Sequence, residues 1–162
     1  MLSFRPVLQE DAPELAAMAD EIWNEYFTAL FPKDQVDYML DKYYSQEAIE
    51  ARIKNKGRCY FFIVDGTTTI GYYAISPHQD SLLVKVYLKS QFRGKGLGKQ
   101  VMKRIYKITK QEGYKRIYLA VEKNNVAAMH AFTRGGYHVS HSLKSDIGNG
   151  YTMDLYILEK EL

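Results

Sequence analysis

The chain has 162 residues, of which 46% are hydrophobic and 25% charged, and its net charge is +3. This composition is typical of a globular protein, and its length predicts one domain spanning residues 1–162. The single cysteine, Cys59, permits no internal disulfide and favours a reducing compartment, with the cytoplasm as the default. No apolar run approaches the length of a membrane span, and the N-terminus lacks an apolar signal region.

Charge is distributed unevenly between the two halves of the chain. Residues 1–80 carry 7 Lys/Arg and 13 Asp/Glu, whereas residues 81–162 carry 15 and 6. We therefore expect the second half to meet an anionic ligand and the first half a cationic one, the alternative being that the charges cover solvated faces. A nucleic-acid partner is not expected, because the net charge is small and the lysines alternate with core positions rather than with stacking aromatics.

Hydrophobic periodicity and turn residues predict the elements of the first half in chain order: a strand at 2–7, helices at 10–30, 36–43 and 45–57, and strands at 58–64 and 69–76. Asp65-Gly66 is a typical hairpin turn between the last two strands. Pro32 is expected to end the first helix and Pro77 to end the second hairpin strand, because proline has no N–H to donate.

The second half alternates strands with helices: strand 82–88, a helix that ends at Gly113, strand 116–121, helix 126–133, and strands 137–142 and 151–158. Successive hairpins argue against a purely parallel doubly wound sheet. The order of elements instead predicts an α/β protein with a mixed sheet of seven strands and helices on both faces.

A glycine-rich turn, Gln91-Phe92-Arg93-Gly94-Lys95-Gly96-Leu97-Gly98-Lys99, joins strand 82–88 to the following helix. Glycines let the backbone approach a ligand closely, and a helix N-terminus binds phosphate through its free N–H groups and its dipole. The spacing excludes a P-loop, because Gly94 and Gly98-Lys99 are one residue too close and Gln100 replaces the required Ser or Thr. A dinucleotide fingerprint is excluded because its third glycine comes one residue later.

The order of elements and two motifs resemble the GNAT superfamily of acyl-CoA N-acetyltransferases. Gln91-x-x-Gly94-x-Gly96 is similar to the pyrophosphate loop Q/R-x-x-G-x-G/A of that family. Leu119-x-Val121-x-x-x-Asn125-x-x-Ala128-x-x-x-Phe132-x-x-x-Gly136-Tyr137 is similar to its segment L-x-V-x-x-x-N-x-x-A-x-x-x-Y-x-x-x-G-F. The segment 145–154 is similar to one in bacterial members that resemble spermidine/spermine acetyltransferases.

This resemblance implies a mainly antiparallel sheet that splays between its fourth and fifth strands, with acetyl-CoA as co-substrate in the gap and no metal. The backbone of Val86-Tyr87-Leu88 would pair with the pantetheine arm, and the N–H of Tyr87 or Leu88 would polarise the thioester carbonyl. Asn125 would touch the cofactor or act as an N-cap, and the two roles are compatible. The implied cofactor-binding residues are Val86, Tyr87, Leu88, Gln91, Arg93, Gly94, Lys95, Gly96, Leu97, Gly98, Lys99, Asn125, Ala128 and Phe132.

The implied reaction is attack of a neutral amine on the thioester through a tetrahedral intermediate, which needs a general base or a proton wire. Two positions depart from the family pattern. Where many relatives carry a tyrosine acid, this chain has Phe132, so Tyr87, Tyr137 and Tyr151 remain unranked substitutes beside unassisted departure of the thiolate.

The second departure is Lys85, at a position where some relatives carry a glutamate base. Lys85 is a catalytic candidate together with the strand residues Tyr87 and Leu88. Its alternative role is that of a strand-edge lysine that reaches solvent.

For the acceptor, the resemblance points to the first helices and the tail. Carboxylates attract an ammonium group and aromatic faces bind cations, so the substrate-binding candidates are Glu21, Trp23, Glu25, Tyr26, Asp146 and Asp154. The alternative is that the aromatic residues belong to the core and the acids to solvated faces.

The predicted function is transfer of acetyl from acetyl-CoA to a primary amine of a small molecule, with a polyamine as one candidate. The alternatives are a protein or peptide N-acetyltransferase and a CoA-binding regulatory protein with little turnover. The expected partner is the small-molecule amine, with no nucleic acid and no membrane. The oligomeric state is not readable from the sequence, and a homodimer is compatible with the resemblance.

Overall fold

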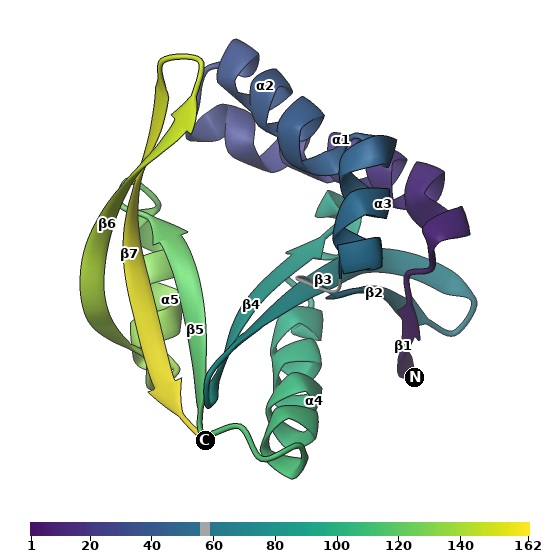
Figure 1. Cartoon of the computed structure of the whole chain (residues 1–162). Coiled ribbons are helices and arrows are strands. Elements are labelled where there is room, and N and C mark those ends of the chain that lie inside the picture. The colour runs from purple at the N-terminus through teal and green to yellow at the C-terminus, as the bar shows by residue number, and fades with distance from the viewer. Residues whose placement is uncertain (56–58) are drawn as a thin grey trace.

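The computed structural model describes residues 1–55 and 59–162, and within them one mixed seven-stranded sheet has the order β1-β2-β3-β4-β5-β7-β6 (Figure 1). Residues 56–58 lie outside the described residues, and with them the expected helix end at Gly57 and the first residue of the strand expected at 58–64. The elements are β1 (Leu2–Pro6), α1 (Ala12–Tyr26), α2 (Lys33–Tyr44), α3 (Gln46–Asn55), β2 (Cys59–Asp65), β3 (Thr68–His78), β4 (Ser81–Leu88), α4 (Leu97–Gln111), β5 (Arg116–Glu122), α5 (Val126–Arg134), β6 (His138–Gly148) and β7 (Tyr151–Glu161). The predicted α/β class and order of elements are confirmed.

The sheet opens between β4 and β5. Every other neighbouring pair is antiparallel, whereas β4 and β5 are parallel and pair only from Ser81 to Leu83 against Arg116 to Tyr118. Beyond Leu83 the two strands diverge, as Figure 1 shows. The predicted splay between the fourth and fifth strands is therefore confirmed.

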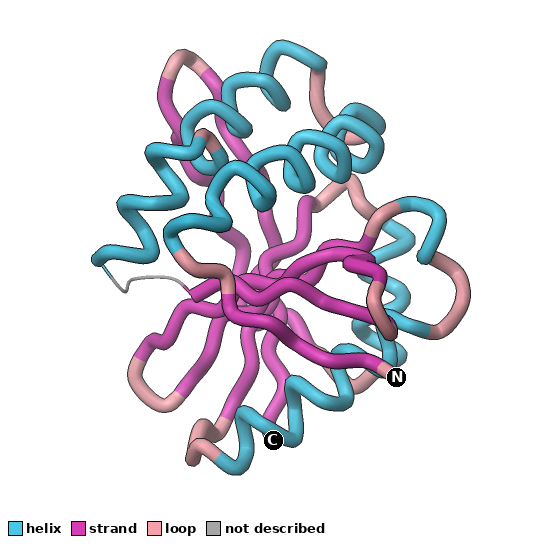
Figure 2. Tube along the Cα trace, turned by 90° about the vertical axis from the view of Figure 1, so that its right-hand side faces the viewer, coloured by secondary structure: helices cyan, strands magenta, loops and turns pink. Residues whose placement is uncertain are grey.

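Helices cover both faces of the sheet, as Figure 2 shows. On one face, α1, α2 and α3 bury residues such as Leu15, Val36 and Ile49 against Phe62 and Tyr72 of the sheet. A second core cluster joins α4 and α5 to the sheet, and its members include Val101, Ile105, Ala128 and Phe132. No helix in the described part of the chain is both long and apolar enough to cross a bilayer.

Pro77 lies inside β3, contrary to the expectation that it ends the strand. The register pairs Pro77 with Leu82. The pair Ile70 and Lys89 is hydrogen-bonded, and hydrogen-bonded and non-hydrogen-bonded pairs alternate along β3 and β4. The N–H groups of the odd-numbered residues of β3 therefore do not bond to β4. On the β4 side the missing N–H of Pro77 therefore costs no ladder bond.

The C-terminal hairpin is longer than predicted, since β6 extends to Gly148 and β7 to Glu161. β6 is an edge strand whose residues 138–144 are all exposed. The apolar alternation is therefore weak, and charged residues such as Lys144 are common on such edges. Sequence periodicity cannot mark the end of a strand that buries so little.

Candidate active site

Alternate peptide groups of β4 face the splay. The N–H of Lys89 donates to the carbonyl of Ile70 at 2.9 Å, in line with the β3–β4 register that pairs Gly71 with Leu88. Antiparallel pairs alternate between hydrogen-bonded and non-hydrogen-bonded, so Tyr87 bonds to β3, whereas the N–H groups of Val86 and Leu88 point toward the β5 side. The β4–β5 register ends at Leu83 and does not reach them.

This register decides between the two N–H groups that the sequence left open for the thioester carbonyl. The N–H of Tyr87 points to β3, which corrects the expectation that it could serve as that donor. The N–H of Leu88 faces the splay. The carbonyl of Leu88 is already used, because it accepts from Nε of Arg93 at 2.9 Å.

The glycine turn positions the start of α4. Gly94 and Gly96 have φ values of 74° and 75°, in the left-handed region that favours glycine, and Gly96 is the N-cap of α4. The first intrahelical bond runs from the N–H of Gln100 to the carbonyl of Gly96, so the N–H groups of the first helical turn are available to an anion. The predicted strand, turn and helix are thus present.

A cavity of about 610 Å³ fills the splay between β4 and β5 and extends to α4 and α5. Nine predicted cofactor residues line it: Val86, Tyr87, Leu88, Arg93, Gly98, Lys99, Asn125, Ala128 and Phe132. Five others lie in the turn outside its lining: Gln91, Gly94, Lys95, Gly96 and Leu97. Gly94 and Gly96 act on this cavity through backbone conformation rather than through direct contact.

Asn125 joins α5 to α1 at the wall of this cavity. Its Oδ1 accepts from the N–H of Ala128 at 3.3 Å, which is the predicted N-cap, and its Nδ2 donates to the hydroxyl of Tyr26. The capping bond fixes the orientation of the amide, so the Tyr26 oxygen accepts and its own proton is left to donate elsewhere. Burial raises the pKa of Tyr26, which keeps the phenol protonated at neutral pH.

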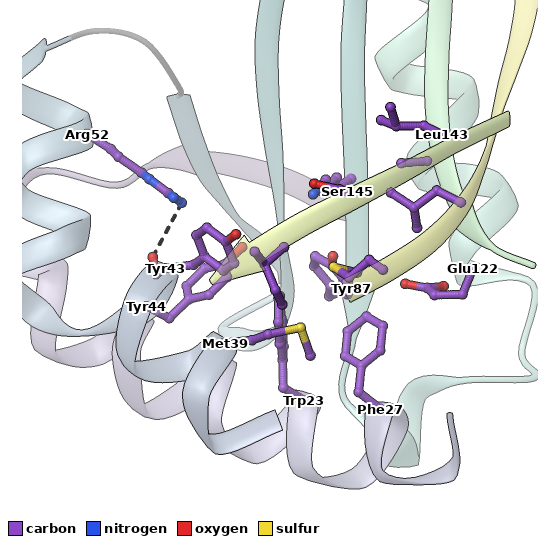
Figure 3. A pocket seen from close by; sticks show the side chains of 15 residues that line it. Trp23, Phe27, Met39, Tyr43, Tyr44, Arg52, Tyr87, Glu122, Leu143 and Ser145 are labelled. Carbon is purple, nitrogen blue, oxygen red and sulfur yellow. Dashed lines mark hydrogen bonds between the residues drawn. The ribbon is translucent and has the colours of Figure 1, made fainter. Parts of the chain in front are cut away.

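A second cavity of about 210 Å³ adjoins the first, and Figure 3 shows its lining. Its walls are mainly apolar and aromatic: Trp23, Phe27, Met39, Tyr43, Tyr44, Tyr87, Leu143, Ile147, Met153 and Leu155. Both cavities share the lining residues Phe27, Lys85, Tyr87, Ala120 and Glu122. The two spaces therefore meet beside the second half of β4 and the end of β5.

Glu122 is the only carboxylate that lines either cavity among the residues described. It is the last residue of β5, is 8% exposed, and directs its carboxylate into the smaller cavity (Figure 3). Burial raises the pKa of this carboxyl group, and the nearby Lys85 opposes the rise. Sequence reasoning missed Glu122, although alternation places it with Ala120 on the face opposite Leu119 and Val121.

Lys85 lines both cavities and is only half-buried. Lys85 therefore faces the site, which is the position that a catalytic role would need. Its positive charge favours the ionised form of Glu122 and so lowers the pKa of that carboxyl group.

The four predicted acceptor carboxylates lie elsewhere. Glu21 pairs with Lys89 at 3.7 Å, and Glu25 is exposed on α1. Asp146 accepts from the N–H of Gly148 in the hairpin turn, and Asp154 lies 4.0 Å from Lys123. None of the four lines either cavity, whereas the predicted aromatic residues do: Trp23 lines the smaller one and Tyr26 the larger.

The three tyrosines considered as substitutes for the missing acid differ in position. Tyr151 donates to Asp34 at 2.9 Å and lines neither cavity. Tyr137 lines the larger cavity, with its hydroxyl 2.5 Å from that of Tyr106. Tyr87 lines both.

Residues 16–137 match the family model of the acetyltransferase (GNAT) family. The chain belongs to this GNAT family. Over 150 residues, which are 90% of this chain and 93% of the relative, the GNAT domain is 22% identical to spermidine N(1)-acetyltransferase of Thermoplasma acidophilum. A mycothiol acetyltransferase of Corynebacterium efficiens is 31% identical over 81 residues, 49% of this chain and 27% of the relative.

Solved structures share the GNAT fold. The PaiA N-acetyltransferase from Thermoplasma acidophilum in complex with coenzyme A has a TM-score of 0.79 at 20% identity, covering 100% of this chain and 99% of that one. The microcin C7 self-immunity acetyltransferase in complex with acetyl-CoA and AMP has a TM-score of 0.72 at 19% identity, covering 99% and 92%. This GNAT protein is an acyl-CoA-dependent N-acetyltransferase with acetyl-CoA as its co-substrate.

The larger cavity fits such a co-substrate. It offers an unpaired strand edge at Val86 and Leu88 for an extended amide-bearing arm, and the start of α4 for a pyrophosphate. In the described part of the chain, no group of three or more His, Cys, Asp or Glu side chains is placed to hold a metal ion.

Proposed function

We propose that this GNAT enzyme acetylates the primary amine of a small molecule that binds in the smaller cavity. The observation that carries the proposal is the meeting of two unequal cavities at Lys85, Tyr87 and Glu122. Acetyl-CoA enters from the larger cavity and supplies an activated acetyl group, and the amine approaches from the smaller one. The nucleophile and the acyl group then meet beside a buried carboxylate.

Glu122 takes the proton from the amine in this proposal. A general base works best when its pKa lies near the operating pH, and burial moves the pKa of Glu122 upward from its ordinary value. A backbone hydrogen bond and the nearby Lys85 oppose this rise in the pKa of Glu122. The N–H of Leu88, which faces the splay, donates to the oxygen on which negative charge develops.

Tyr26 donates the proton that Phe132 cannot supply. Its hydroxyl accepts from Asn125 in the wall of the cofactor cavity, which leaves the phenolic proton for the sulfur that departs. The guanidinium of Arg93, 5.4 Å from the centre of the Tyr26 ring, holds the ring on the α4 side of the cavity. This role replaces those considered for Tyr87, Tyr137 and Tyr151.

Hydrogen bonds join the β6–β7 hairpin to α2 across the smaller cavity, and this closure favours a small molecule over a peptide. The hydroxyl of Tyr38 donates to the carbonyl of Ile147 at 2.7 Å, and Nε2 of Gln35 donates to the carbonyl of Thr152 at 3.1 Å. Ile147 and Met153 of this hairpin line the cavity. A protein substrate would need an open groove at this place.

Release of the CoA thiol from acetyl-CoA tests the proposal with a panel of amines. The panel includes spermidine, because a relative is a spermidine acetyltransferase, together with amino acids, aromatic amines and peptides with free N-termini. Turnover with at least one small amine is expected. Acetylation of peptides alone would favour a protein acetyltransferase, and a CoA-dependent rise in melting temperature without turnover would favour a CoA-binding regulator.

We also propose that the protein is cytoplasmic and forms a homodimer. The free, exposed Cys59 is compatible with a reducing compartment. Sedimentation of the protein with and without CoA gives its oligomeric state directly.

A further inference from the structure

The smaller cavity carries a guanidinium group at the end opposite Glu122. Arg52 extends from α3 toward the cavity, and the aromatic rings of Tyr43, Tyr44 and Trp23 lie between it and the end at Glu122 (Figure 3). An acceptor that fills the cavity therefore meets a carboxylate at one end and a cation at the other.

Part of the Arg52 side chain is held by the protein. Its Nη1 donates to the carbonyl of Tyr43 at 3.4 Å and to the hydroxyl of Tyr60 at 3.2 Å. Its Cζ lies 5.0 Å from the centre of the Tyr43 ring. These contacts fix the plane of the guanidinium and reduce the entropy lost when a ligand binds to it.

No carboxylate among the described residues balances the charge of Arg52. Within residues 1–55 and 59–162, no carboxylate oxygen lies within 4.0 Å of its guanidinium nitrogens, and its Nε and Nη2 donate to no described residue. Nε and Nη2 form the edge of a guanidinium that binds a carboxylate through two parallel hydrogen bonds. The contacts of Arg52 with the described residues therefore leave this two-donor edge available to a ligand.

The charges that line the smaller cavity also favour an acceptor with an anionic group. Its charged lining residues are Arg52, Lys85 and Glu122, two cations and one acid. A polyamine, which carries several ammonium groups, would face both cations with a single carboxylate to neutralise it. A molecule with one amine and one anionic group complements the cavity at both ends.

We propose that the acceptor is an amine-bearing carboxylic acid with an apolar or aromatic body. Its amine lies at Glu122, its carboxylate binds the Nε and Nη2 edge of Arg52, and its body packs against Trp23 and Tyr43. This inference rests on the proposed function, because it names the substrate class of the same site. Arg52 contacts the substrate away from the reacting atoms and sets specificity.

Matched pairs of acceptors test the inference. 4-(Aminomethyl)benzoate and its amide, and 5-aminopentanoate and its amide, carry the amine at one end and the acid or amide at the other and differ chiefly in the negative charge, and spermidine is the polyamine comparison. We expect kcat/KM for each acid to exceed that for its amide about tenfold or more, since hydrogen bonds to charged groups are the strong ones. Spermidine is expected to be a poorer acceptor than the acids.

Variants then assign the preference to Arg52. Arg52→Gln should lower kcat/KM for the acids about 10- to 100-fold, mainly through KM, and leave the amides unchanged. Arg52→Lys keeps the charge without the paired donors and should recover part of the loss. Lys54→Gln, which removes an exposed charge from the same helix, is the matched control and should leave all acceptors unchanged.

The outcomes separate this inference from the proposed function. Equal rates for acids and amides, or a preference for spermidine, would overturn the inference and leave the acetylation of small amines standing. An equal loss for acids and amides in Arg52→Gln would also overturn it, because Arg52 would then act only through its contacts with Tyr43 and Tyr60. No thiol release with any small amine, in a protein that acetyl-CoA still stabilises against heat, would remove the proposed function and the inference with it.

Discussion

The two cavities are built by different means. The larger one is also lined by side chains, but the groups that it offers to a co-substrate are backbone groups: the edge of β4 beyond Leu83 and the start of α4, which two glycines with positive φ position. The smaller one is formed by side chains from elements far apart in the chain, from Trp23 in α1 to Leu155 in β7. A backbone-built site can hold one co-substrate throughout a family, whereas a side-chain-built site can change its acceptor with a few substitutions.

The largest expected effect lies where the two cavities meet. Glu122→Gln should lower kcat/KM about 100- to 1000-fold, because it removes the proposed general base without changing the shape of the site. The rise in melting temperature with acetyl-CoA should persist, since the larger cavity keeps its backbone. Glu50→Gln, which neutralises an exposed acid on α3, is the control. A variant of Glu122 with normal turnover would rule out its role as base.

The pH dependence of kcat/KM and of stability is a second test of Glu122 as the general base. Burial raises its pKa above the ordinary value of 4.5, so kcat/KM should fall with decreasing pH at a point above 4.5. Between the two pKa values the native state binds more protons than the unfolded state, so stability is lost as pH rises through this window. Glu122→Gln should therefore become the more stable protein toward neutral pH, as thermal melts at several pH values would show.

Gly71→Ala tests how the larger cavity depends on the position of β4, because Gly71 lies on β3, the neighbouring strand on the other side of β4. A Cβ at this position of β3 would lie 2.1 Å from the carbonyl oxygen of Tyr87 and 2.9 Å from Cα of Leu88. β4 must then move at the residues whose N–H groups face the cofactor, so we expect a loss of about 3 kcal/mol in unfolding free energy. Denaturant titration measures the loss, and the stabilisation by CoA should fall with it. An unchanged CoA affinity would show that the position of β4 is not critical for binding.

Tyr26→Phe should have a smaller effect on turnover. Loss of the proposed proton donor should lower kcat about 10- to 100-fold, within the range of a positioned acid, with little change in CoA affinity. Phe132→Tyr in the same chain places a phenol where many relatives carry one and should restore part of the rate. Full activity of Tyr26→Phe alone would assign the proton to another group or to water.

Gly98→Ala should give the smallest effect on the fold and a clear one on binding. A Cβ at Gly98 would have Leu88 Cδ1 at 4.0 Å as its nearest contact, so the ligand-free protein should gain about 0.5 kcal/mol from the better helix former. Because Gly98 lines the larger cavity, the added methyl should reduce the thermal shift caused by CoA. Gln100→Ala, an exposed change in the same helix, should leave that shift unchanged.

The sequence predicted the strand, glycine turn and helix beside the larger cavity because these elements depend on local rules. Gly94, Gly96 and Asn125 each mark a conformation that a motif records: a left-handed turn, a helix start and an N-cap. Glu122 and Arg52 carry no such local mark. Their place in the lining of the smaller cavity becomes visible only when β5 is placed beside β4 and α3 beside α2, which is a property of the tertiary structure.

The same reasoning explains why the predicted acceptor acids lie outside both cavities. Glu21 and Glu25 belong to α1, the helix that supplies Trp23 to the smaller cavity, but they lie on its exposed side. The helical pattern shows which residues share a face, yet the lining of the cavity also depends on how the β6–β7 hairpin closes over it. The aromatic residues predicted for the acceptor therefore line the cavities, and the predicted carboxylates do not.

The three-residue parallel pairing of β4 with β5 gives one strand two kinds of amide. Tyr87 and Lys89 bond to β3 whether or not a ligand is present, whereas Val86 and Leu88 face the splay. Amide hydrogen exchange should therefore alternate along β4, fast at Val86 and Leu88 and slow at their neighbours, and should become uniformly slow when CoA binds. Exchange rates measured at Val86 and Leu88 would thus report the fraction of the enzyme that has CoA bound.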